Sequence, residues 1–337
     1  MKLVTRIFII GFFLNLKVIY STLAQDPQVS QPFAISSALS PAFTGIHFKD
    51  NVQLLYRNQF PNLGGSYTFG LVNINMILPK IQSGLGLSAS YDEQFKNLKT
   101  TNISLKYAYH IILSKKSILS AGIEGGWQHR AIDFKNYVFP NYATGSLNAN
   151  SFDPTINSLA NSSNFFDLGV GILYYTSKSW IGISSHHINQ PNQSVGIGSI
   201  DILNRKYSLQ MGTNFTLSNL NESPVNISPV IYLKKQGELI QLDLGSYLNV
   251  GAIELGLWYR GVPLISNSSG NESLVALIGY SATDYNIGFS HDFLISGLMG
   301  FASGANEITV GFYFNRDKEN VLRKFLNKRG KLSCPKF

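Results

Sequence analysis

The feature that most constrains this chain is an alternation of apolar and polar residues, which recurs in short runs along its length. In the run 305–314 (ANEITVGFYF), one set of alternate residues is apolar: Ile308, Val310, Phe312 and Phe314. The other set is Glu307, Thr309, Gly311 and Tyr313. Alternate residues of a strand point to opposite faces of a sheet, so the pattern predicts a strand with one apolar face. A length of about ten residues with an aromatic end is typical of a tilted strand that crosses a bilayer.

The composition separates this kind of chain from a bundle of membrane helices. Charged residues make up 14% of the sequence and the mean hydropathy is +0.04. No run of about eighteen or more apolar residues follows the first segment of the chain, so membrane helices are not predicted. Few charges without long apolar runs favour a sheet with one apolar and one polar face.

Short alternating runs separated by turn residues begin near residue 51, and they predict an all-β fold. The expected architecture is a transmembrane antiparallel β-barrel of about 14 strands, with short periplasmic turns and long extracellular loops. A soluble β-sandwich would also alternate, but its polar faces should carry more Lys and Glu than these runs do. The predicted strands are 51–58, 66–77, 83–92, 99–112, 117–130, 165–176, 180–188, 206–215, 225–233, 240–247, 251–260, 273–281, 285–293 and 305–314.

The connections between these strands support the same architecture. The longest ones are 131–164, 189–205, 261–272 and 294–304, and they alternate with short connections such as 113–116 and 177–179. We place the long loops outside the cell and the short turns in the periplasm. Because a membrane sheet cannot leave an unpaired edge in lipid, the last strand 305–314 is expected to pair with the first strand 51–58.

The two ends of the chain differ from its body. Residues 1–24 have a basic start, an apolar centre and small residues before Gln25, which predicts a secretory signal peptide cleaved after Ala24. Residues 25–50 form an irregular N-terminal segment, expected to dock in or under the barrel of residues 51–314. Residues 315–337 form a basic periplasmic tail. The net charge of +8 comes from these ends, so nucleic-acid binding is not indicated.

No constellation of residues suited to catalysis is present, so no enzymatic activity, cofactor or metal is predicted. His186 and His187 are adjacent in a predicted strand and are expected to point to opposite faces, which excludes a shared metal. The single cysteine, Cys334, cannot form a disulfide within the chain. Charged residues on the polar faces are expected to pair across the barrel interior rather than line a conduit: Lys106, Glu124, Arg130, Asp243, Glu254, Arg260 and Asp292.

Several short motifs, in order along the chain, resemble those of a known family. They are LSPAFTG at 39–45, YRNQFP at 56–61, YAYHI at 107–111, HINQP at 187–191, NEI at 306–308, FYF at 312–314 and CPKF at 334–337. Each is weak alone, but the ordered set is similar to the PorP/SprF family of type IX secretion and gliding-motility membrane proteins of the Bacteroidota. Ser40 stands where the family usually has Asn.

The resemblance implies a non-enzymatic outer-membrane barrel of a Gram-negative bacterium, working with type IX secretion components and outer-membrane lipid. Its expected task is to assist export of a secreted adhesin, or to anchor that adhesin at the surface through the adhesin's C-terminal domain. Arg57 is the best candidate for a specific contact, because a guanidinium suits a carboxylate or backbone carbonyls. The candidate partner-binding residues are Arg57, Tyr137, Phe139, Tyr142, Phe152, His187 and Gln190.

Alternatives remain open at this stage. The loop aromatics could pack on the barrel rim instead of binding a partner, and Arg57, His187 and Gln190 could serve packing alone. Polar residues facing the interior would also suit a porin or a channel for apolar solutes. The tail at 315–337 could bind periplasmic lipoproteins or other acidic partners, although a solvated basic tail is the simpler interpretation.

Overall fold

The computed structural model describes residues 26–47, 49–62, 65–114, 116–132, 162–196, 198–220, 223–261, 272–295 and 303–314. The predicted signal peptide at 1–24 and the basic tail at 315–337 lie outside these residues. So do residues 133–161, most of the longest predicted loop, and 262–271 and 296–302 in two further loops.

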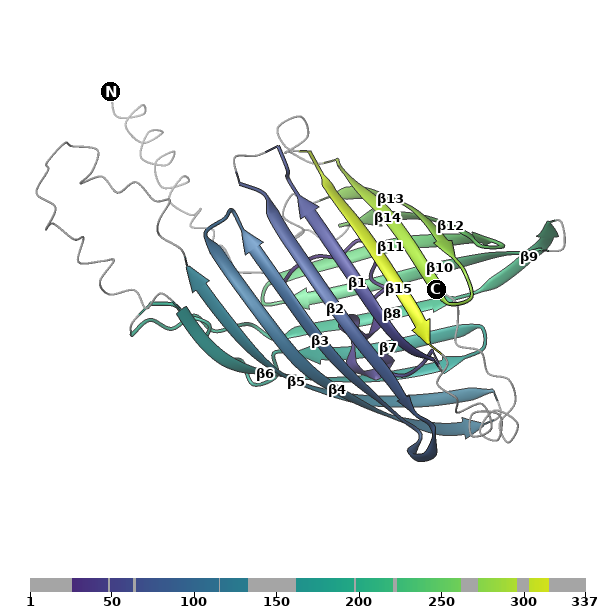
Figure 1. Ribbon diagram of the computed structural model, residues 1–337, viewed down its shortest axis with the longest axis horizontal. Helices are drawn as coiled ribbons and strands as arrows, with labels where there is room; N and C mark the ends of the chain where they lie inside the picture. The colour runs from purple at the N-terminus through teal and green to yellow at the C-terminus, as the bar shows by residue number, and fades with distance from the viewer. Residues whose placement is uncertain are drawn as a thin grey trace, which may run out of the picture.

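One antiparallel sheet closes on itself to form a barrel (Figure 1). The last strand pairs with the first over ten residue pairs, with Arg57 opposite Glu307, so the predicted closure of 305–314 on 51–58 is confirmed. The strands are β1 (Asp50–Gln59), β2 (Tyr67–Leu78), β3 (Ser83–Gln94), β4 (Leu98–Ser114), β5 (Ser117–Ile132), β6 (Ser162–Thr176), β7 (Ser179–His186), β8 (Lys206–Thr213), β9 (Phe215–Leu220), β10 (Ser223–Gln236), β11 (Leu239–Val250), β12 (Ile253–Arg260), β13 (Ser273–Ser281), β14 (Tyr285–Leu294) and β15 (Ala305–Phe314).

The sheet has 15 strands by sequence order, whereas 14 of them form the closed ring, which confirms the predicted count. The additional strand is β9. The sequence predicts one strand over 206–215 and a connection over 216–224 in this region. In the structure β8 ends at Thr213, and β9 continues the same direction while pairing with β10 alone. The reason lies in β7, which begins at Ser179 and offers no partner further along.

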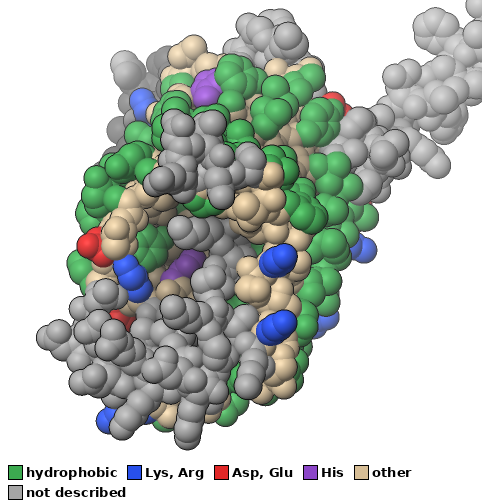
Figure 2. All heavy atoms as spheres, turned by 90° about the vertical axis from the view of Figure 1, so that its right-hand side faces the viewer, with side chains coloured by type: hydrophobic (Ala, Val, Ile, Leu, Met, Phe, Trp, Pro, Cys, Tyr) green, Lys and Arg blue, Asp and Glu red, His purple; other side chains and the backbone are tan. Residues whose placement is uncertain are grey.

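The outer face of the barrel is apolar and the inner face is polar, as the alternation predicts. On β4 and β5, Leu105 and Ile123 are about 60% exposed (61% and 60%), whereas Ser104 and Lys106 are buried. Hydrophobic side chains cover the flanks in Figure 2, which views the barrel from the end where β9 lies. This distribution suits lipid outside and polar contacts inside.

The N-terminal segment lies inside the barrel. It contains two short helical turns, α2 (Ser36–Leu39) and the 3-10 turn η1 (Pro41–Phe43). Among the described residues, no helix is both long and apolar enough to span a membrane. Because nearly all of residues 30–46 are buried against the inner faces of the strands, we refer to residues 26–47 as the plug.

Contrary to the sequence prediction, the interior is not entirely polar, because an apolar cluster packs around the middle of the plug. Phe33 packs between Trp180, at a centroid distance of 5.0 Å, and Trp258, at 5.9 Å. Phe43 lies against the same Trp180 ring, edge to face, at 5.9 Å. The cluster is a dry core between plug and wall, and it contributes hydrophobic burial that a water-filled channel would lack.

Glycines on the inner wall give the plug its room. A Cβ at Gly122 would overlap the backbone of Pro41 and Ala42, and one at Gly84 would overlap Thr44. Both glycines therefore permit a close approach of backbone to backbone.

We expect Gly122→Ala to destabilise the protein by about 1–3 kcal/mol, because the added methyl group must displace the η1 turn. Gly125→Ala is the matched control on the same strand, since a Cβ there would meet only Leu168, at 3.9 Å. The measurement is urea unfolding in detergent micelles for the two variants and the parent. Equal stability of the two variants would contradict the tight fit at Gly122.

Candidate functional site

Four charged side chains of the wall converge on the plug, and we refer to Arg57, Arg260, Asp292 and Glu307 as the arginine cluster. The Nη2 of Arg57 lies 2.8 Å from Oδ2 of Asp292, and its Nη1 lies 3.3 Å from Oε2 of Glu307. Arg260 donates to the same Asp292 oxygen at 2.8 Å. The Arg57 and Glu307 side chains are 1% and 0% exposed, so this pairing takes place away from water.

The arginine cluster binds backbone groups of the plug and the hydroxyl group of Ser30. The N–H groups of Ser30 and Gln31 each donate to a Glu307 carboxylate oxygen at 2.7 Å. Arg260 donates to the carbonyl of Val29 at 3.0 Å. The Ser30 hydroxyl accepts from Arg57 at 2.5 Å and donates to Asp292 at 2.5 Å. Charge-assisted hydrogen bonds of this kind are the strong class, so they fix the plug against the wall.

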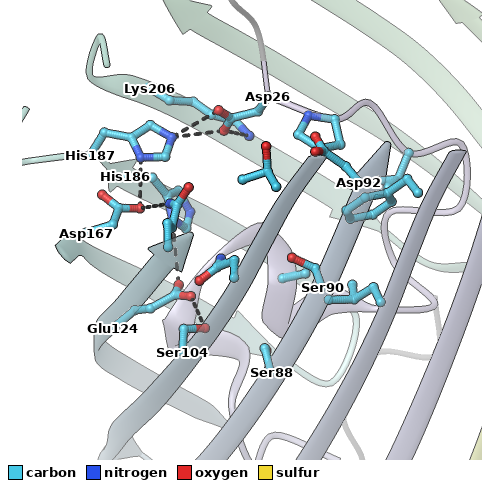
Figure 3. Close-up of a pocket in the computed structure, with 18 of the residues that line it drawn as sticks. Asp26, Ser88, Ser90, Asp92, Ser104, Glu124, Asp167, His186, His187 and Lys206 are labelled. Carbon is cyan, nitrogen blue, oxygen red and sulfur yellow. Dashed lines mark hydrogen bonds and ion pairs between the residues drawn. The ribbon is translucent and has the colours of Figure 1, made fainter. Parts of the chain in front are cut away.

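A second group of contacts holds the start of the plug, and we refer to Asp26, His187, Lys206 and Gln236 as the Asp26 cluster. The Asp26 carboxylate lies 2.8 Å from Nζ of Lys206 and 3.1 Å from Nε2 of His187 (Figure 3). Gln236 donates to it at 3.0 Å, and the Asp26 N–H donates back to the Gln236 side chain at 3.2 Å.

Electrostatics keep the Asp26 cluster charged. Burial opposes ionisation of Asp26, but the positive charges of His187 and Lys206 outweigh it and hold the Asp26 pKa well below 3.8. Burial also disfavours the charged imidazole of His187, yet the carboxylates of Asp26 and Asp167 raise its pKa from 6.5 to about 10. At neutral pH the cluster is therefore a set of ion pairs.

The prediction that His186 and His187 point to opposite faces is wrong. Both side chains lie inside the barrel, with ring centroids 6.3 Å apart (Figure 3). His186 is the last residue of β7, and His187 adopts a positive φ of 56°, which breaks the strand alternation and turns its ring inward. His186 lies 3.7 Å from Glu124 and His187 binds Asp26 and Asp167. No group of His, Cys, Asp and Glu suited to a metal ion is found in the described ranges.

Ion pairs also tie the wall together beside the plug. Lys106 lies 3.7 Å from Glu124, which accepts from Ser104 at 2.6 Å. Lys234 pairs with Asp243 at 3.1 Å. Arg130 approaches Asp201 at 4.0 Å. Of the charged residues expected to face the interior, Glu254 alone has no ion-pair partner within the described part of the chain. Most of the charged residues expected to face the interior thus form ion pairs.

A cavity of about 220 Å³ remains between the plug and the wall of β3 to β7 (Figure 3). Its lining is mixed: Ser88, Asp92, Ser104 and Glu124 supply polar groups, and apolar side chains such as Phe69 line the rest. A second cavity of about 340 Å³ lies on the side of Arg57 and Arg260. Residues 26–28 border both cavities, so the start of the plug separates them.

The candidate residues from the sequence are placed as follows. Arg57 belongs to the arginine cluster, and His187 belongs to the Asp26 cluster. The structure therefore does not bring these two residues together. Gln190 is half-buried in the turn after His187, to whose carbonyl its N–H donates at 3.0 Å. Tyr137, Phe139, Tyr142 and Phe152 lie outside the described residues.

Sequence reasoning missed the plug side of both clusters, Asp26 and Ser30. A usable signal was present in the wall, because the predicted closure of the last strand on the first puts Arg57 opposite Glu307. A buried Arg and Glu facing each other on an inner surface indicate a fixed contact.

The sequence of residues 21–312 matches the family model described as type IX secretion system membrane protein PorP/SprF. The chain belongs to the PorP/SprF family. Its fold and family are those of a membrane barrel that is a component of the type IX secretion system, in the outer membrane of a Gram-negative bacterium. No curated protein matches the sequence.

Several solved structures are similar to this chain at low identity. The CymD monoaromatic hydrocarbon channel is 14% identical, with a TM-score of 0.49 over 86% of this chain and 94% of that one. Omp33 of Acinetobacter baumannii is 8% identical, with a TM-score of 0.43 over 80% of this chain and 100% of that one. A variant porin of Rh. blastica is 8% identical, with a TM-score of 0.34 over 79% and 99%.

Proposed function

We propose that this protein is a non-enzymatic partner of a secreted adhesin in type IX secretion and gliding motility. It assists export of the adhesin or holds its C-terminal domain at the cell surface, in contact with other secretion components. The family assignment supports the secretion role. The observation that favours anchoring over passive transport is the plug, which two sets of buried ion pairs fasten inside the barrel.

In an anchor, the arginine cluster and the Asp26 cluster would stiffen the barrel. A barrel that holds a large surface protein must resist forces applied at its outer mouth. Ion pairs and hydrogen bonds between the plug and the wall reach β1, β7, β8, β10, β12, β14 and β15, so the plug cross-links widely separated strands. Arg57 and His187 then support the binding surface from within rather than contacting the adhesin. The surface itself is formed by the outer loops, with Tyr137, Phe139, Tyr142 and Phe152 as candidate anchors.

Deletion of the gene tests this proposal in cells that retain the rest of the secretion system. We expect loss of one surface adhesin, measured by antibody labelling of intact cells, with its accumulation inside the cell or in the medium. Restoring the full-length protein should restore labelling. As the matched comparison, a variant with Tyr137, Phe139, Tyr142 and Phe152 changed to Ser should assemble in the membrane yet fail to restore labelling. Unchanged display of every surface adhesin after deletion would refute the proposal.

A porin or a channel for apolar solutes is the second candidate, favoured by the two cavities that border the plug. The two functions differ in what they require of the plug, since a channel needs it displaced and an anchor needs it in place.

A further inference from the structure

The strand β9 has a free edge although the barrel is otherwise closed. In the described part of the sheet β9 pairs with β10 alone, while each strand of the ring has two neighbours. The strand that would flank its other side, β7, starts only at Ser179. The Asn214 N–H, just before β9, donates to the carbonyl of Lys178 in the turn before β7, at 2.7 Å. Figure 1 shows β9 at the right-hand end of the barrel, reaching past most of the other strands. Every second residue of an edge strand points its N–H and C=O away from the sheet.

Two side chains of β9, those of Phe215 and Leu217, are apolar and exposed. Phe215 is 53% exposed and Leu217 is 60% exposed, at the end of the barrel that carries the short periplasmic turns. A largely apolar groove of about 550 Å³ lies at the base of β9, on the flank formed by β7, β8, β10 and β11. Ile181, Met211 and Leu244 are among the residues that line it. Edge and groove are continuous along the chain through Gly212 and Thr213.

A β-bulge limits the length of the edge. The register between β9 and β10 shifts between Val225 and Asn226, which face Ser218 and Thr216, so Leu217 is the additional residue. Bulges twist an edge strand and prevent open-ended sheet growth. This edge therefore suits one short strand rather than aggregation.

A second copy of this chain does not fit the edge. Symmetric pairing of two β9 strands would be antiparallel, which requires a two-fold axis perpendicular to the strands. Two barrels in one membrane are related by an axis along the membrane normal, which runs closer to the strand direction. The symmetric dimer would place the second barrel outside the membrane, so the occupant is a different protein.

We infer that β9 binds an extended segment of a periplasmic protein by β-strand addition. The segment carries an apolar residue at every second position, which packs against Phe215 and Leu217, while its backbone pairs with the free edge. This periplasmic contact lies beyond the proposed binding of an adhesin at the outer loops, and each can fail without the other.

The test uses the full-length protein in lipid nanodiscs and a fluorescent nine-residue peptide of alternating Val and Thr. We expect saturable binding by fluorescence anisotropy, and at least a tenfold loss of affinity for the doubly substituted Phe215→Lys, Leu217→Lys variant, because lysines protect natural sheet edges. Ile253→Lys is the matched control with less than a twofold effect, since Ile253 is exposed at the same end but β12 has two neighbours.

The backbone contribution is tested by a peptide of the same sequence that is N-methylated at alternate residues, which removes hydrogen-bond donors and blocks strand addition. We expect its affinity to fall at least tenfold. Equal binding of both peptides, equal binding to the Lys variant and the parent, or no binding of either peptide would overturn the inference. Disulfide-linked dimers of a Leu217→Cys, Cys334→Ser variant in the membrane would overturn the assigned occupant.

Discussion

Replacing Arg57 with methionine is expected to lower the free energy of unfolding by about 3–5 kcal/mol, the usual cost of removing one partner from a buried ion pair. The reason is that Glu307 is fully buried, and without Arg57 it keeps only the N–H groups of Ser30 and Gln31. Asp292 retains Arg260 but loses one of its two cations. Urea titration in detergent micelles, followed by tryptophan fluorescence, measures the change.

Two further variants show whether this loss is electrostatic. In the double variant Arg57→Met, Glu307→Gln the uncompensated charge is removed, so part of the stability should return; the difference from additivity is the coupling of the pair. Lys99→Met is the matched control, because Lys99 and Glu93 are 39% and 28% exposed and 3.9 Å apart. An exposed pair contributes about 0–1 kcal/mol. If Arg57→Met cost no more than Lys99→Met, the arginine cluster would not hold the plug.

The fold could be predicted from the sequence because its main determinant is local. The period of two along each run assigns inner and outer faces of the sheet. Because neither edge of the sheet can remain unpaired in lipid, β15 must pair with β1. The family could be predicted from the ordered motifs. The local pattern cannot predict where a strand ends when that end depends on the length of a neighbouring strand. The separation of β8 from β9 at Asn214 depends on where β7 begins, 35 residues earlier, at Ser179.

The candidate site was harder to predict, for a different physical reason. Residues 26–47 show little periodicity, and their position in the interior depends on contacts with strands more than 200 residues away, such as Ser30 with Asp292 and Asp26 with Gln236. The inward rotation of His187 depends on a positive φ at a residue other than glycine, which the sequence does not signal. Arg57 could be singled out by its chemistry, whereas its plug partner Ser30 required the register of the barrel.

Deleting residues 26–47 is expected to turn a barrel without stable conductance into an open pore. Eight-stranded barrels are filled by their own side chains, whereas barrels of about 16–18 strands enclose an aqueous channel. With 14 strands in the ring, the interior exceeds what the wall side chains fill, and the plug occupies the remainder. Single-channel recording in planar bilayers should therefore show brief or no openings for the full chain and a rise of at least about tenfold in conductance for the deletion.

The deletion also exposes Trp180, Tyr247 and Trp258 to water, so a second variant keeps the apolar core of the plug and weakens only its ionic contacts. Asp26→Asn with Ser30→Ala removes the charge that His187 and Lys206 bind and the hydroxyl that bridges Arg57 to Asp292. We expect this variant to fold and to show transient openings, intermediate between the full chain and the deletion. Asp284→Asn, which alters only an exposed pair with Lys49, should record like the parent.

The outcome decides between the two candidate functions. A full-length chain that conducts steadily, at the level of the deletion, would mean that the plug leaves a continuous path, and a channel would then be the better interpretation. A closed full chain together with an open deletion would mean that the plug keeps the interior shut, and transient openings of the Asp26→Asn, Ser30→Ala variant would assign part of that closure to its ionic contacts. A shut barrel retains the permeability barrier of the outer membrane while its loops are engaged, as an anchor for a surface adhesin requires.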